Sequence, residues 1–156
     1  MTSTPIDWVG MVGVEGRAFV DTNVLLYAHD GTETTKQPIA RALLEGLWET
    51  RGGVISTQVL QEFYVVATRK FSPPMARHEA REIIELYSAW PVIVLDPTVI
   101  LGATRLEEDH QVSFWEALIL EAARVAGAER LLTEDLQHGQ VIEGVRIENP
   151  FTEVPR

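Results

Sequence analysis

The sequence combines 156 residues with no cysteine and a formal net charge of −10, and these properties exclude several classes of protein. The length suits one domain, and 46% apolar residues are enough to bury a core, whereas the lack of cysteine excludes disulfide bonds and cysteine-based zinc sites and fits a reducing cytoplasm. With 23 acidic and 13 basic residues, an extended basic surface for nucleic acid is not expected, although an acidic site that binds cations is compatible with this charge.

The chain is expected to form one α/β domain between two short tails. Residues 1–16 lack a basic start followed by a long apolar core, so we interpret them as an N-terminal tail and not as a secretion signal. No apolar run approaches the roughly 18 residues of a membrane span, and we expect a cytoplasmic protein with no membrane partner. The domain is assigned to residues 17–151, and residues 152–156 form a C-terminal tail.

Short apolar segments alternate with longer amphipathic segments along the domain. Strands are expected at residues 17–21, 54–56, 92–95, 130–132 and 145–148. Helices are expected at residues 23–28, 36–50, 57–69, 74–89, 98–109 and 113–126, the fourth of them opening at Ser72-Pro73-Pro74 with proline in its first turn. This alternation predicts a three-layer α/β/α fold around a central parallel sheet of four to five strands.

Two acids follow predicted strands directly. Asp21 ends the first strand, and Asp135 comes shortly after the strand at residues 130–132. Ligands of open α/β sheets bind outside the carboxyl ends of the strands, so both acids are expected at the binding edge. Asp21 could instead cap the following helix, unless Thr22 or Asn23 caps it and leaves Asp21 free for a metal, and Asp135 could be a turn or cap residue.

Two further acids interrupt apolar helix faces. Glu62 lies three residues after Val59 and four before Val66, so it shares their apolar face and needs a partner, which could be a metal, metal-bound water or an arginine. Glu116 lies in an apolar run, but its position three residues after Ser113 also fits a capping box. Four carboxylates gathered at one edge would form a Mg²⁺ or Mn²⁺ site suited to phosphodiester hydrolysis.

The remaining charged residues are interpreted as ordinary surface. Glu134 and the acids at residues 107–109 are expected to be solvated, and the four histidines show no metal-ligand spacing. The basic side chains at positions 69, 70, 77 and 81 could contact nucleic-acid phosphates or form a solvated face.

Four blocks of the sequence together resemble the PIN-domain nucleases, most closely the VapC-type toxins of toxin–antitoxin pairs. The blocks are Phe19-Val20-Asp21-Thr22-Asn23-Val24-Leu25-Leu26-Tyr27, Ile55-Ser56-Thr57-Gln58-Val59-Leu60-Gln61-Glu62-Phe63, Ser113-Phe114-Trp115-Glu116-Ala117-Leu118-Ile119 and Leu131-Leu132-Thr133-Glu134-Asp135-Leu136-Gln137-His138-Gly139. By position, the resemblance implies that Asp21, Glu62, Glu116 and Asp135 are the family's catalytic and metal-binding acids. It also implies that Thr133 and Asn23 support them. Glu116 departs from the aspartate that is usual there.

The resemblance implies a Mg²⁺- or Mn²⁺-dependent ribonuclease, the toxin of a type II toxin–antitoxin system. Its expected partners are an RNA substrate, a cognate antitoxin protein and a second copy of the chain in a homodimer. Two alternatives stay open. One is a PIN-like module that only binds RNA or protein because Glu116 degrades the site, and the other is a PIN nuclease of RNA processing without an antitoxin. A phosphatase with Asp21 as its nucleophile is disfavoured, because no second acid stands two residues on.

Overall fold

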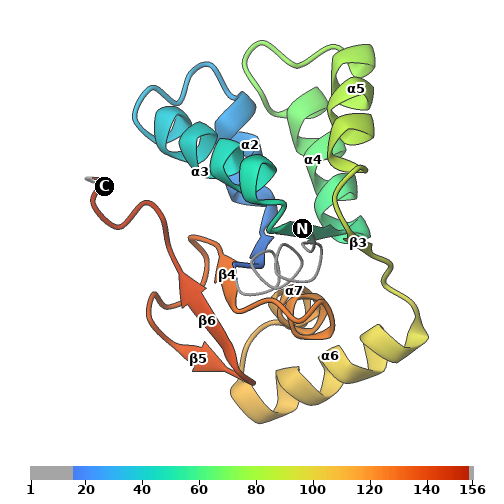
Figure 1. Ribbon diagram of the computed structural model, residues 1–156. Helices are drawn as coiled ribbons and strands as arrows, with labels where there is room; N and C mark the ends of the chain where they lie inside the picture. The colour runs from blue at the N-terminus through green and yellow to red at the C-terminus, as the bar shows by residue number, and fades with distance from the viewer. Residues whose placement is uncertain (1–15, 155–156) are drawn as a thin grey trace, which may run out of the picture.

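The computed structural model describes residues 16–154, and Figure 1 shows how their helices and strands are arranged. The elements in chain order are β1 (Ala18–Val20), α2 (Thr22–His29), α3 (Lys36–Thr50), β2 (Gly53–Ser56), α4 (Thr57–Arg69), α5 (Arg77–Tyr87), β3 (Val92–Ile93), α6 (Pro97–His110), α7 (Phe114–Val125), β4 (Arg130–Leu132), β5 (Val141–Ile142) and β6 (Val145–Glu148). The predicted N-terminal tail lies almost entirely outside the described residues.

The described strands form one sheet in the order β3-β2-β1-β4-β6-β5. All pairs are parallel except β5 with β6. The chain builds outward from β1 through β2 to β3 and then crosses to the other side of β1, where β4 pairs with it. The strand order therefore reverses between β1 and β4, which is where ligands bind in open α/β sheets.

The α/β prediction is confirmed, with one more strand than expected. The extra strand, β5, is only two residues long and pairs with β6 across a tight turn in which Glu143 and Gly144 both have positive φ, 50° and 82°. Val141 and Ile142 stand alone between the polar Gln140 and Glu143, so the sequence does not indicate this strand.

Helices lie on both sides of the sheet, as the three-layer prediction requires. In Figure 1, α2, α3, α4 and α5 lie on one side of the strands, and α6 and α7 lie on the other. The strands supply much of the core, where Phe19, Ile55 and Leu131 are buried together with Phe63 of α4 and Leu120 of α7. Within residues 16–154, no helix has both the length and the apolarity to span a bilayer.

The largest difference between a predicted and an observed helix boundary is at the start of α5, and the other helix ends differ by two residues or fewer. The helix expected from Pro74 begins at Arg77, and Ala76 precedes it without a side-chain cap. A residue that precedes proline is disfavoured in the helical conformation, which applies to both Ser72 and Pro73. The backbone here bonds to helix α4 instead, because the Met75 amide donates to the Ala67 carbonyl at 2.9 Å.

Two glycines offer a matched test of this packing. We expect Gly53→Ala to destabilise the fold by about 1–3 kcal/mol, because the new Cβ would lie 2.6 Å from ring atoms of the buried Trp90. Gly46→Ala is the control, since nothing lies within 4 Å of its Cβ position and alanine favours helix α3 by about 1 kcal/mol. Urea unfolding measures both, and equal stability of the two variants would contradict this packing.

Candidate active site

Asp21 lies at the carboxyl end of β1, in the gap where the strand order reverses. Its side chain is 8% exposed and accepts two hydrogen bonds of 2.7 Å, to Oδ1 from the Thr22 amide and to Oδ2 from the Thr133 hydroxyl. Asp21 is the N-cap residue of α2, so Thr22 and Asn23 do not take over that role. The same carboxylate thus caps helix α2, and Asp21 also lines the acidic site.

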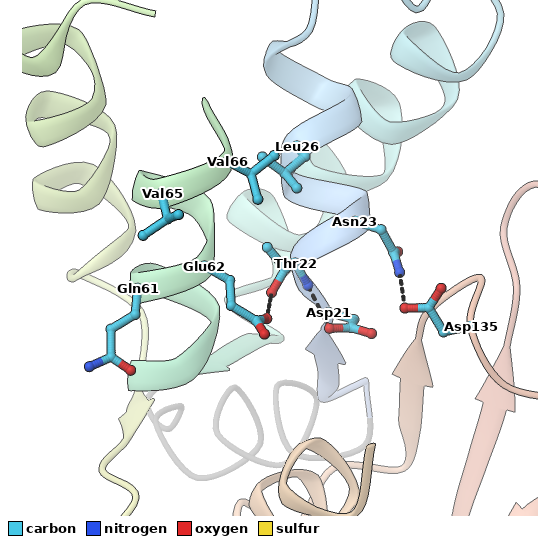
Figure 2. Close-up of a pocket in the computed structure, with 9 residues that line it drawn as sticks. All are labelled: Asp21, Thr22, Asn23, Leu26, Gln61, Glu62, Val65, Val66 and Asp135. Carbon is cyan, nitrogen blue, oxygen red and sulfur yellow. Dashed lines mark hydrogen bonds between the residues drawn. The ribbon is translucent and has the colours of Figure 1, made fainter. Parts of the chain in front are cut away.

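Asp135 lies on the loop after β4 and is tied to the same structure. Its Oδ2 accepts from the Asn23 side-chain amide at 3.0 Å, as Figure 2 shows, and its backbone amide donates to the Thr133 hydroxyl oxygen at 3.1 Å. Thr133 is fully buried and bonds to both acidic residues. The two strand-end acids therefore lie at the same edge of the sheet, as predicted.

Glu62 points toward the same edge from helix α4. Its Oε1 accepts from the Thr22 hydroxyl at 2.7 Å, and its Oε2 lies 3.5 Å from the Gln58 amide nitrogen. Figure 2 shows this carboxylate beside Asp21. Of the partners expected for Glu62, an arginine is absent among the described residues, and neutral hydrogen bonds take its place.

Glu116 forms the capping box that its spacing with Ser113 allowed. The Glu116 carboxylate accepts from the Ser113 amide at 3.0 Å, and the Ser113 hydroxyl accepts from the Glu116 amide at 3.1 Å. The side chain nevertheless lines the same cavity as the other three acids. Glu116 therefore both caps α7 and lines the acidic cavity.

The four acids line one small cavity of about 90 Å³. Asp21, Glu62 and Asp135 also line a larger cavity of about 410 Å³, whose other wall is apolar and includes Leu26 and Val66 (Figure 2). No Lys, Arg or His lines either cavity. None of the four acids forms a salt bridge within residues 16–154, so their charge is not neutralised by the described part of the protein.

This environment shifts Asp21 and Asp135 toward their neutral forms. The pKa of Asp21 is raised to about 6, mainly by burial and also by the carboxylates of Asp135 and Glu62, against the opposing effect of the hydrogen bonds from Thr133 and Thr22. The pKa of Asp135 is also raised, first by burial and then by neighbouring carboxylates. The site therefore favours a bound proton or a bound cation.

The donor atoms suit a hard divalent cation. All four acids offer oxygen, which Mg²⁺ and Mn²⁺ prefer. Two amide oxygens beside them, Asn23 Oδ1 and Gln58 Oε1, are buried without a hydrogen-bond partner in the described structure, and water carried by an ion would supply donors. The side chains do not already converge on one point, because no group of three or more acids or histidines in residues 16–154 is arranged to hold a metal ion.

Some contacts at the site could not be read from the sequence. Thr22 and Gln58 partner Glu62, and neither stood out in the sequence. The prediction that Glu134 is solvated surface is wrong: its carboxylate forms a 3.0 Å ion pair with Lys36 and accepts a hydrogen bond from the Tyr27 hydroxyl. Lys36 lies 98 positions earlier, so no local pattern indicates this pair.

The basic residues proposed as phosphate contacts lie apart from these cavities. Their side chains are exposed, and none of them lines either cavity; they are Arg69, Lys70, Arg77 and Arg81.

Comparison with known proteins identifies the family to which the chain belongs. A sequence model of the PIN domain matches residues 18–143, which is most of the chain. This chain therefore belongs to the PIN-domain family. No curated protein matches the sequence significantly.

Solved structures of VapC-type and related toxins share the fold. A toxin–antitoxin complex from Klebsiella pneumoniae matches 85% of this chain and 97% of its own, at 21% identity and a TM-score of 0.63. VapC20 of Mycobacterium tuberculosis, a sarcin–ricin loop cleaving toxin, matches 73% of this chain and 86% of its own at 19% identity and a TM-score of 0.57. VapBC2 of Rickettsia felis, bound to a promoter DNA fragment, matches 85% of this chain and 97% of its own, at 17% identity and a TM-score of 0.60.

The raised pKa of Asp21 predicts a pH-dependent stability in the absence of metal. Between pH 3.8, where an ordinary aspartate titrates, and about 6, the native state binds more protons than the unfolded chain, so stability falls as the pH rises. The loss attributable to Asp21 is on the order of 3 kcal/mol, and Asp21→Asn should remove most of it. Urea unfolding across this range measures both proteins, and parallel pH profiles would contradict the assignment.

Glu116→Gln separates the two roles of this side chain. Glutamine also completes a capping box, so we expect the free energy of unfolding to change by less than about 0.5 kcal/mol. Glu116→Asp should cost about 0.5–1 kcal/mol, because the shorter side chain does not reach the Ser113 amide. Thermal unfolding compares the two variants. A large loss in Glu116→Gln would show that the charge itself stabilises α7.

Proposed function

We propose that this chain is a metal-dependent ribonuclease that hydrolyses RNA phosphodiester bonds and acts as the toxin of a type II toxin–antitoxin pair. The observation that carries the proposal is the set of four carboxylates around one cavity at the strand-order reversal, with no basic side chain lining it. Carboxylates gathered without cations are suited to bind divalent metal, and metal bound there suits phosphodiester hydrolysis. Membership of the PIN-domain family supports the same chemistry.

In this proposal Asp21, Glu116 and Asp135 hold one or two Mg²⁺ or Mn²⁺ ions, with Glu62 bound directly or through water. The metal would activate water and offset the charge that develops on the phosphate. The rest of the chemistry is positioning. Thr133 holds Asp21 Oδ2, Asn23 holds Asp135 and Thr22 holds Glu62, and because these donors are neutral the acids keep their charge for a cation.

The proposed partners are an RNA substrate, a cognate antitoxin and a second copy of the chain in a homodimer, with the complex in the cytoplasm. Structural neighbours include a toxin–antitoxin complex and VapBC2 bound to promoter DNA, which supports an antitoxin partner. The net charge of −10 suits an antitoxin segment that carries arginine or lysine. A neighbouring gene that encodes a small protein with a basic tail would favour a toxin over a nuclease of RNA processing.

We expect purified protein to cleave RNA with Mg²⁺ or Mn²⁺ and to be inactive in EDTA. Asp21→Asn should lower cleavage by at least about a hundredfold, because it removes a charged ligand at the centre of the site. The control is Asp109→Asn, an exposed acid of α6 outside both cavities, which should cleave like wild type. Gel analysis of several labelled RNAs measures all three proteins.

Two outcomes would contradict this function. Cleavage that persists in EDTA, or cleavage that Asp21→Asn retains, would show that the acidic site is not needed for hydrolysis. A folded wild type that binds RNA or antitoxin equally with and without metal, and cuts none of the RNAs, would favour the binding module. Glu116→Asp then separates a spoiled site from narrow target choice, since it restores cutting only in the first case.

A further inference from the structure

An exposed tryptophan stands at the rim of the acidic cavity. Trp115 is the second residue of α7, its side chain is 65% exposed, and it lines the small cavity together with all four acids. Trp48 and Trp90, by contrast, pack against each other and against the buried Tyr87, and Trp90 is itself buried while Trp48 is half-buried. A large indole left in water next to a polar site offers a flat apolar face for a ligand.

The backbone that carries Trp115 is held in place. Its carbonyl lies 3.5 Å from the Gln58 amide nitrogen, and the capping box of Ser113 and Glu116 fixes the turn around it. The half-buried Phe114 ring contacts the indole edge to face, with centroids 5.3 Å apart and planes at 72°. Because these neighbours orient the ring, stacking on it costs little conformational entropy.

The charge around the site makes such a contact useful to RNA. Proteins usually bind nucleic acid by neutralising phosphates with Lys and Arg. No basic side chain lines either cavity, and Lys36, which lies nearby, is paired with Glu134. Apart from bound metal, the lining of these two cavities offers an RNA strand only contacts that are not ionic, and stacking of a base on an aromatic ring is one that single-strand-binding proteins use.

We infer that Trp115 is a base-stacking residue that holds one unpaired RNA base beside the phosphate at the acidic cavity, with purines favoured over pyrimidines. This inference rests on the proposed function. A base within a duplex has both faces covered by its neighbours, so only a strand with a splayed base can use the ring. Purines are favoured because their larger π face overlaps more of the indole.

The test measures binding separately from cleavage, with fluorescein-labelled adenine and uridine decamers whose phosphorothioate linkages resist hydrolysis. In Mg²⁺, Trp115→Ala should bind the adenine decamer about tenfold more weakly than wild type, and Trp115→Phe should retain most of the affinity. The uridine decamer should be affected less and a blunt duplex not at all. Leu101→Ala, which truncates an exposed side chain of α6 outside both cavities, is the matched control.

An abasic position moved along the adenine decamer locates the contact. Where the missing base is the stacked one, wild type and Trp115→Ala should bind equally. The inference is overturned if Trp115→Ala binds the adenine decamer like wild type, if duplex binding falls equally, or if wild type binds no decamer. Loss of antitoxin binding with RNA binding unchanged would also overturn it. Stacking without any RNA cleavage would refute the proposed function alone.

Discussion

The parallel pairing of β1 with β4 is the constraint on which the acidic site depends. Val20 lies opposite Leu132 in this pair, and the Asp21 amide donates to the Leu132 carbonyl at 3.0 Å. This register brings the Thr133 hydroxyl onto the Asp21 carboxylate, although 112 positions separate them. The loop that follows Thr133 then carries Asp135 to Asn23. A one-residue shift in the register would move these side chains to the other face of the sheet.

The same arrangement places a charge where the fold does not favour one. A carboxylate that is 8% exposed and has no cation partner among the described residues is costly, and the raised pKa of Asp21 expresses that cost. The packing of the buried strands against the helices on both sides offsets this cost. A site of this kind gives up stability in the free protein and recovers it when a cation binds.

Local patterns predicted that two of the acids follow strands, but they did not predict which residues contact the acids. Asp21 and Asp135 follow apolar strands, and the spacing of Glu62 on a helix face showed that it needs a partner. Which partner it has depends on a contact across 40 positions, from the Thr22 hydroxyl. The spacing of Ser113 and Glu116 allowed either a cap or a site residue, and in the structure Glu116 caps α7 and also lines the cavity.

The central claim is that the four acids form a cation site whose buried aspartate exchanges a proton for metal. Calorimetric titration of Mn²⁺, in two buffers with different ionisation heats, tests it directly because it counts both the ion and the protons released. The account predicts saturable binding that Asp21→Asn abolishes, with clear proton release near pH 5.5 and little near pH 8, on either side of the Asp21 pKa of about 6. Absence of saturable binding by the folded wild type, or equal binding by Asp21→Asn, would contradict it.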